Sequence, residues 1–154
     1  MPNLYPEGYE NEEITAADLT AEKAVGYRNG IAFDYEAGDF KRDGMNKILD
    51  SDGIQSWKDW CINCLQTERY KHLAYSTDFG IELDAAMRAG SQEEAEAILT
   101  RQITEALMAD PYERTAYVSD ITYDWTAIDT VAVGVTIHGV TDVTIDLKAY
   151  LTRK

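Results

Sequence analysis

Residues 117–151, YVSDITYDWTAIDTVAVGVTIHGVTDVTIDLKAYL, alternate apolar and polar side chains along three segments. This period of two is typical of β-strands that bury one face. Short loops, around 124–130 and 138–139, separate the segments, which favours an antiparallel three-stranded meander. The alternating apolar side chains are Tyr117, Ile121, Tyr123 and Trp125, then Val131, Val133, Val135 and Ile137, then Val143, Ile145, Leu147, Ala149 and Leu151.

Two main helices are predicted before these strands. The first covers residues 53–66, with Asp52 as its N-cap, and the second starts after Ser91, which forms a capping box with Glu94. Pro111 prevents the second helix from continuing, and a shorter helix is predicted over 81–88. The apolar stripe of the first helix is Ile54, Trp57, Cys61, Cys64 and Leu65, and that of the second is Ala95, Ile98, Leu99, Ile103, Ala106 and Leu107.

Short strands are also predicted in front of the first helix. Residues 30–35 and 39–41 have the pattern of two strands around a turn, and 45–49 form a candidate third strand that ends in the turn sequence of residues 50–53. The predicted fold class is therefore α+β. An antiparallel sheet, made of the C-terminal meander and the N-terminal short strands, is covered on one face by the two main helices.

Acidic residues outnumber basic ones, with 28 Asp and Glu against 14 Lys and Arg and a formal net charge of −14. Phosphate groups are bound by basic surfaces, so this balance argues against nonspecific binding to nucleic acid or to an anionic membrane. No apolar run approaches the roughly 20 residues of a membrane span, and the first residues lack the pattern of a signal peptide.

Residues 1–28 are predicted to be an acidic N-terminal arm in front of a single domain, residues 29–154. Residues 1–40 carry nine acidic and two basic side chains, which is half of the net negative charge. The arm has few large aliphatic side chains to offset an ordering entropy of roughly 1–2 kcal/mol per residue. Two interpretations remain open: a solvated tail, and a docking arm that becomes ordered on a partner.

Cys61 and Cys64 form a Cys-x-x-Cys pair, which raises the question of redox or metal chemistry. Thioredoxin-like chemistry needs such a pair at a helix N-terminus, whereas both cysteines lie late in a predicted helix and on its apolar stripe. With His72 and His138 four zinc ligands can be counted, but their spacing matches no standard zinc finger. Both thiols are therefore predicted to be buried, reduced and metal-free, and no cofactor is expected.

No catalytic residue is predicted. A glycosidase needs two carboxylates on either side of the bond that it cleaves, and no motif selects a pair from Glu68, Asp78, Glu82, Glu105 and Glu113. A Ser-His-Asp hydrolase motif and a glycine-rich phosphate loop are both missing from the sequence.

A resemblance to a known family rests on two blocks. They are Thr67-Glu68-Arg69-Tyr70 after the first helix, and Tyr75-Ser76-x-Asp78-Phe79-Gly80-x-Glu82-Leu83. Over residues 29–138 the chain resembles the baseplate wedge family of contractile-tail phages and prophages, in its Gram-positive prophage branch. The wider family carries a "lysozyme-like" label. The resemblance implies a non-enzymatic structural protein, made in the bacterial cytoplasm and incorporated into the virion tail baseplate.

The implied partners are other baseplate and tail proteins, namely a large wedge protein and tail tube or sheath components. The wider family has a Glu-Pro-Arg docking triplet after its long helix. Here the sequence is Asp110-Pro111-Tyr112-Glu113-Arg114, so the proline is displaced, and the resemblance would give the docking role to Glu113 and Arg114.

Glu68, Arg69 and Tyr70 are candidate partner-binding or loop-fixing residues. An internal salt bridge between Glu68 and Arg69 that fixes the 67–80 loop is the preferred interpretation, and Tyr70 is expected to pack in the loop or core. Two other functions stay open. A carboxylate with a raised pKa in a cleft would favour a peptidoglycan-cleaving glycosidase, and rows of exposed acids at phosphate-like spacing would favour an acidic DNA mimic.

Overall fold

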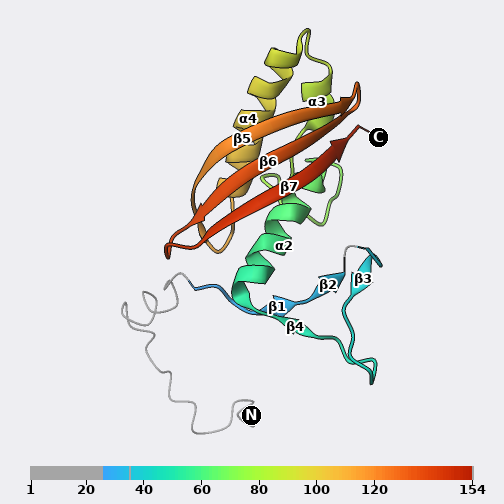
Figure 1. The fold of residues 1–154 in the computed structure, drawn as a ribbon, viewed down its shortest axis with the longest axis vertical. Helices are drawn as coiled ribbons and strands as arrows, with labels where there is room; N and C mark the ends of the chain where they lie inside the picture. Colours follow the sequence, from blue (N-terminus) through green and yellow to red (C-terminus); the bar gives the residue numbers. More distant parts are fainter. Residues whose placement is uncertain (1–25, 35, 154) are drawn as a thin grey trace, which may run out of the picture.

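The structure is a computed structural model that describes residues 26–34 and 36–153. Most of the predicted arm, residues 1–25, lies outside the described residues. In chain order the elements are β1 (Gly30–Ile31), β2 (Phe33–Asp34), β3 (Asp39–Phe40), β4 (Asp50–Ser51), α2 (Gly53–Gln66), α3 (Leu83–Met87), α4 (Gln92–Met108), β5 (Thr115–Ala127), β6 (Thr130–Gly139) and β7 (Thr144–Thr152) (Figure 1). The α+β class is confirmed.

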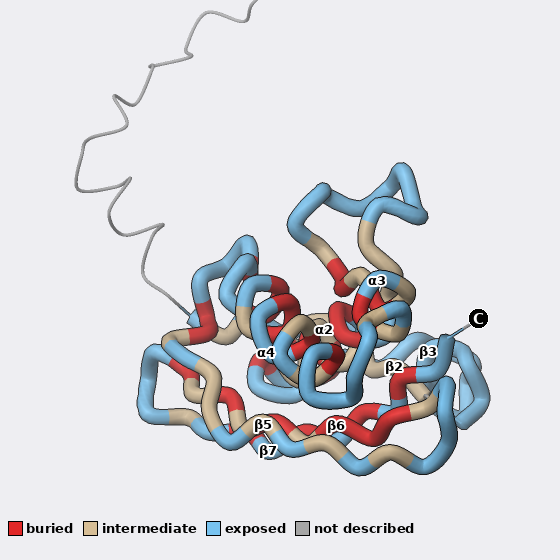
Figure 2. The backbone as a smooth tube through the Cα atoms, turned by 90° about the horizontal axis from the view of Figure 1, so that it is seen from above, coloured by how far each residue is buried: buried red, intermediate tan, exposed pale blue. Residues whose placement is uncertain are grey.

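The C-terminal strands form the predicted antiparallel meander, in the order β5-β6-β7. The helices lie on one face of this sheet, and its other face is open to solvent (Figure 2). The inward side chains of β6 and β7 alternate as predicted and join α2, α3 and α4 in one core. The fully buried large side chains include Trp57, Leu65, Leu99, Ile103, Leu107, Val133 and Ile137.

The alternation predicted for β5 is wrong at its first position. Tyr117 is 56% exposed, whereas its neighbour Val118 packs against the core. The cause is a β-bulge: the register with β6 shifts around Asp120, whose φ of 50° lies in the left-handed region. One extra residue reverses the face to which the strand's side chains point. Beyond the bulge Ile121, Tyr123 and Trp125 pack against the core as predicted.

The helix starts are confirmed by their caps. Asp52 Oδ1 accepts a hydrogen bond from the Gln55 N–H (2.8 Å), and Ser91 Oγ accepts one from the Glu94 N–H (3.2 Å). One assignment to the stripe of α2 is wrong, because Ile54 is 43% exposed. It lies in the first turn, and the part of the helix that enters the core begins at Trp57. None of the helices in the described part of the chain combines the length and apolarity needed to cross a bilayer.

The strand predicted over residues 45–49 does not form. Asp43 Oδ1 accepts hydrogen bonds from the N–H groups of Met45 and Lys47, and this turn leaves Met45 91% exposed. The strand lies one step later, as β4, which pairs with β1, while β2 pairs with β3. These four short strands and their turns, residues 30–34 and 36–51, are called the N-terminal lobe below. Figure 1 shows the lobe beyond the N-terminal end of α2, away from the three-stranded sheet.

Tyr27, which the sequence assigns to the arm, is packed into the folded domain. The centroid of its ring lies 5.2 Å from that of the Trp57 ring. The backbone of Tyr27 and its hydroxyl group each lie against a glycine. A Cβ atom at Gly53 would overlap the Tyr27 carbonyl, and one at Gly139 would overlap the Tyr27 hydroxyl. The hydroxyl is buried and has no hydrogen-bond partner among the residues that the structure describes. Two glycines thus provide the space in which residue 27 is held.

Candidate docking surfaces

Two backbone hydrogen bonds close the 67–80 loop at its base. The Arg69 N–H donates to the Ile81 carbonyl, and the Ile81 N–H donates to the Thr67 carbonyl, both at 3.0 Å. Gly80 adopts φ 92°, and a Cβ there would lie 2.5 Å from the Thr67 carbonyl oxygen. Only glycine adopts this backbone conformation without strain so close to another chain segment.

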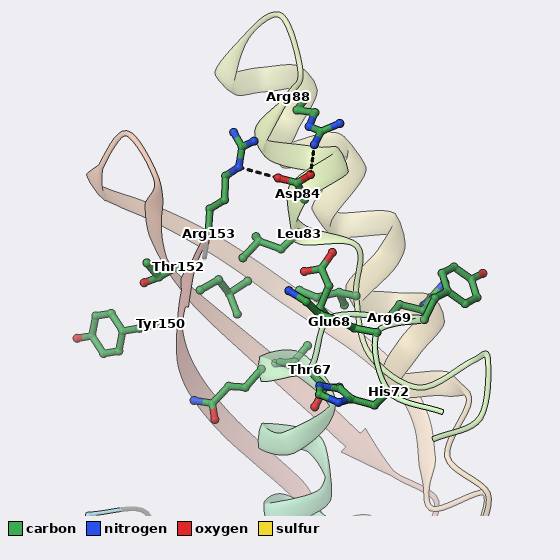
Figure 3. A pocket seen from close by; sticks show the side chains of 16 residues that line it. Thr67, Glu68, Arg69, His72, Leu83, Asp84, Arg88, Tyr150, Thr152 and Arg153 are labelled. Carbon is green, nitrogen blue, oxygen red and sulfur yellow. Dashed lines mark ion pairs between the residues drawn. The ribbon is translucent and has the colours of Figure 1, made fainter. Parts of the chain in front are cut away.

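The Arg69 side chain contacts this loop and α4, and not the partner that the sequence suggested. Its Nε donates to the Gly80 carbonyl (2.9 Å), and its Nη1 lies 4.0 Å from Glu105 Oε2 on α4. Glu68 makes no ion pair among the described residues, so the predicted Glu68–Arg69 salt bridge is absent there. Figure 3 shows the Glu68 carboxylate pointing away from the Arg69 side chain and into a pocket. Glu105, which is distant in sequence, is thus the ion-pair partner of Arg69 instead of the adjacent Glu68.

The aromatic residues of the loop divide into packed and exposed ones. Phe79 packs edge-on against Trp60 of α2 (5.8 Å between ring centroids) and stacks at a tilt on Tyr75 (4.6 Å). Tyr70, which was expected to pack in the loop or core, is instead 65% exposed, with a left-handed φ of 66°. Its ring is therefore available to a partner.

The pocket that Glu68 enters has a volume of about 1100 Å³ and lies between the 67–72 segment, α3 and the end of β7. At its rim Asp84 binds two guanidinium groups, those of Arg88 (2.5 Å) and Arg153 (2.6 Å) (Figure 3). The pair with Arg153 ties α3 to the residue that follows β7. Because one carboxylate is shared by two arginines, the triad carries a net positive charge.

The turn at Pro111 contains a buried ion pair that sequence reasoning missed. Arg114 Nε and Nη2 donate to the two carboxylate oxygens of Asp110 at 2.7 and 2.9 Å, and the two side chains are 5% and 0% exposed. The guanidinium also lies over the rings of Trp60 (5.8 Å) and Tyr112 (5.1 Å). Arg114 thus holds the turn together from inside.

Glu113 lies on the outside of the same turn, exposed and with φ 53°. The loops that carry the two predicted groups both contact Trp60 of α2, the 67–80 loop through Phe79 and the Pro111 turn through Arg114. The available signal for the ion pair was the spacing of Asp110 and Arg114, four residues apart across a proline turn.

Cys61 and Cys64 are buried in the core, as predicted, and both are free. Burial raises the pKa of both thiols, that of Cys64 to about 11.

We expect neither thiol to react with a thiol reagent at pH 8 faster than the protein unfolds, whereas both thiols should react at once in denaturant. The folded pKa values exceed the unfolded ones, so stability is unaffected at neutral pH and falls as the pH rises above about 8.5. Rapid labelling of the native protein would contradict this, and metal analysis tests the predicted absence of zinc.

The outer edge of β7 is a further candidate docking surface. Among the described residues, β7 pairs only with β6. The Gly139 N–H donates to the Val143 carbonyl (2.6 Å) and the Arg153 N–H to the Asp129 carbonyl (2.9 Å), at the two ends of this ladder. Along an edge strand of an antiparallel sheet, the backbone N–H and C=O groups of every second residue bond the neighbouring strand, and those of the residues between point outward. The odd-numbered residues of β7 therefore form the hydrogen bonds to β6. The N–H and C=O groups that point outward belong to Thr144, Asp146, Lys148, Tyr150 and Thr152.

Comparison with known families matches residues 29–142 to one described as the contractile injection system sheath initiator. Among curated proteins, no individual relative matches significantly. The predicted resemblance to a baseplate component of contractile tails is thus confirmed at that level, whereas the wedge assignment and the "lysozyme-like" label gain no support. The match covers most of the chain and ends just before β7. The chain therefore belongs to the contractile injection system sheath initiator family, structural proteins of the baseplate from which sheath assembly starts.

Proposed function

We propose that this protein is a non-enzymatic adaptor that offers the open edge of β7 to a segment of the first sheath subunits. The observation that carries this is the regular β6–β7 register, which runs without a shift from Thr130↔Thr152 to His138↔Thr144. A straight edge strand with unpaired N–H and C=O groups is a template for a further strand. The nine residues of β7 provide roughly 30 Å of such a template.

The opposite edge of the sheet is a poorer template. The register of β5 shifts at three places, and Asp120 adopts a left-handed conformation in its middle. Bulges twist an edge strand and interrupt its row of hydrogen-bonding groups, and proteins use them to prevent edge pairing. The two edges therefore differ in a way that favours one docking direction.

The predicted site residues take different parts in this proposal. Arg69 and Arg114 would fix their loops from inside, a role supported by their contacts with Gly80, Glu105 and Asp110. Exposed or partly exposed side chains on the same loops are candidate contacts to a large wedge protein or to tail tube components. These are Glu68, Tyr70 and Glu113.

The acidic arm is proposed to dock on a baseplate partner. Because Tyr27 is held by Gly53, Gly139 and Trp57, we place the start of the folded domain at residue 27 rather than 29. The protein would be made in the bacterial cytoplasm and then join the particle, which is consistent with two free cysteines.

The test is sheath polymerisation from purified components. Adding this protein to sheath subunits, at a concentration where they do not assemble alone, is expected to shorten the lag phase of polymerisation. Light scattering follows the lag, and electron microscopy shows whether this protein is at the end of each polymer. An unchanged lag with no association would contradict the proposal.

Peptidoglycan cleavage is expected to be absent. The pocket that holds Glu68 has a second carboxylate, Asp84, but this one is bound by Arg88 and Arg153 and does not complete an acid and nucleophile pair. We therefore expect the purified protein to clear a peptidoglycan suspension no faster than buffer. Clearing that is lost on Glu68→Gln would instead favour the glycosidase.

A further inference from the structure

The N-terminal lobe is folded but has no core of its own. From residue 26 to 50, no described residue is buried, and the first buried one is Ser51. Pairs of two-residue strands are marginal in water, because they bury too little apolar surface to offset the entropy of ordering. The lobe nevertheless carries five exposed large apolar side chains: Ile31, Phe40, Met45, Ile48 and Leu49. Ordinary surfaces do not gather so many on one small module.

We infer that the N-terminal lobe is a docking surface for a baseplate protein that presents an apolar patch bordered by lysine and arginine side chains. This inference rests on the proposed adaptor function and assigns the second of its two interfaces. Figure 1 shows the lobe set off from the three-stranded sheet, beyond the N-terminal end of α2.

Charge identifies the kind of partner. The lobe carries five acidic and three basic side chains, and it follows an arm, residues 1–25, with six acidic and one basic. The Asp34 carboxylate accepts hydrogen bonds from the N–H groups of Ala37 and Glu36, which lower its pKa and keep it ionised. With five acidic and three basic side chains the lobe has a net negative charge, which favours a basic partner.

The same charges disfavour the other occupants. A second copy of this chain would bring together two proteins of formal net charge −14. The chain's own residues 1–25 are acidic too and contain few large apolar side chains. Nucleic acid and anionic lipid would be repelled. A basic protein surface is the occupant that both the apolar and the acidic side chains of the lobe fit.

The test uses the full-length chain and each baseplate protein of the same contractile system, purified singly. The lobe variant is Met45→Ser/Leu49→Ser, and the matched control is Met108→Ser/Ile128→Ser, which removes one methionine and one aliphatic side chain, both exposed and outside the lobe. We expect the lobe variant to bind one baseplate protein at least roughly tenfold more weakly, while the control binds normally. Glu36→Lys should weaken the same binding most at low salt.

The outcomes separate this inference from the proposed function. Lobe variants should still shorten the lag of sheath polymerisation, because that function is assigned to β7. If they bind every baseplate protein like the unmodified chain, or lose only the effect on the sheath, the inference is wrong. If sedimentation shows that the unmodified chain self-associates and that the lobe variant does not, the occupant of the lobe is a second copy of this chain and not a basic partner. Loss of baseplate binding in a protein that never affects the sheath would keep the lobe inference and reject the proposed function.

Discussion

Replacing Arg114 with alanine is expected to lower the free energy of unfolding by about 3–5 kcal/mol, the usual cost of breaking a buried ion pair from one side. The Asp110 side chain is fully buried, and without the guanidinium its charge would remain in the interior with two backbone N–H donors from the described residues, those of Tyr112 and Arg114. The rings of Trp60 and Tyr112 would also lose the cation that lies over them. Both losses act on the same turn.

Chemical denaturation of the two proteins measures the difference. Arg88→Ala is the control, because its pair with Asp84 is largely exposed and such pairs contribute at most about 1 kcal/mol. If Arg114→Ala costs no more than Arg88→Ala, the Asp110–Arg114 pair does not have the structural role assigned to it.

Gly53→Ala is the second large effect, expected to cost about 2–3 kcal/mol through overpacking. Helix propensity predicts the opposite sign, since alanine is favoured over glycine in helices by roughly 1 kcal/mol. The added Cβ would overlap the Tyr27 carbonyl, so the chain that enters the domain would have to move. Tyr27 would then lose its contact with Trp57.

The cause can be isolated by combining Gly53→Ala with a deletion of residues 1–27. Without Tyr27 the overlap is gone, and the substitution should become neutral or slightly stabilising in thermal unfolding. An equal cost in the full-length and shortened chains would show that residue 27 does not pack on the helix start. It would also restore a domain that begins at residue 29.

Much of the fold could be predicted because it depends on local rules. The alternation in β6 and β7 and the caps at Asp52 and Ser91 involve neighbours in sequence, and the structure confirms them. The exposure of Tyr117 could not be predicted, because a bulge is set by pairing with another strand. The strand predicted over residues 45–49 does not form, because the Asp43 carboxylate accepts hydrogen bonds from two backbone N–H groups of this segment and holds it in a turn.

The candidate site depends on contacts distant in sequence, and these were predicted less well. Glu68 was the nearest acid to Arg69, yet the fold brings Glu105 from α4 to it instead. The resemblance implies docking for Arg114, whereas the structure shows its side chain buried in an ion pair with Asp110. The predicted meander makes β7 an edge strand, but which of its backbone groups point outward follows only from the hydrogen bonds of Gly139 and Arg153.

The most direct test of the account is sheath polymerisation with Lys148→Pro and Lys148→Ala. The N–H of Lys148 points to the open edge, so proline there removes an outward donor without breaking the β6–β7 ladder, and edge strands tolerate such a proline. Alanine keeps the donor, while both variants lose the contact of Lys148 with Tyr150. Thermal unfolding first verifies that each variant is folded, and Tyr150→Pro repeats the test at a second outward position. We expect Lys148→Ala to shorten the polymerisation lag like the unmodified protein, and we expect Lys148→Pro, although folded, not to shorten it. Equal shortening by both variants would contradict a docking role for the β7 edge.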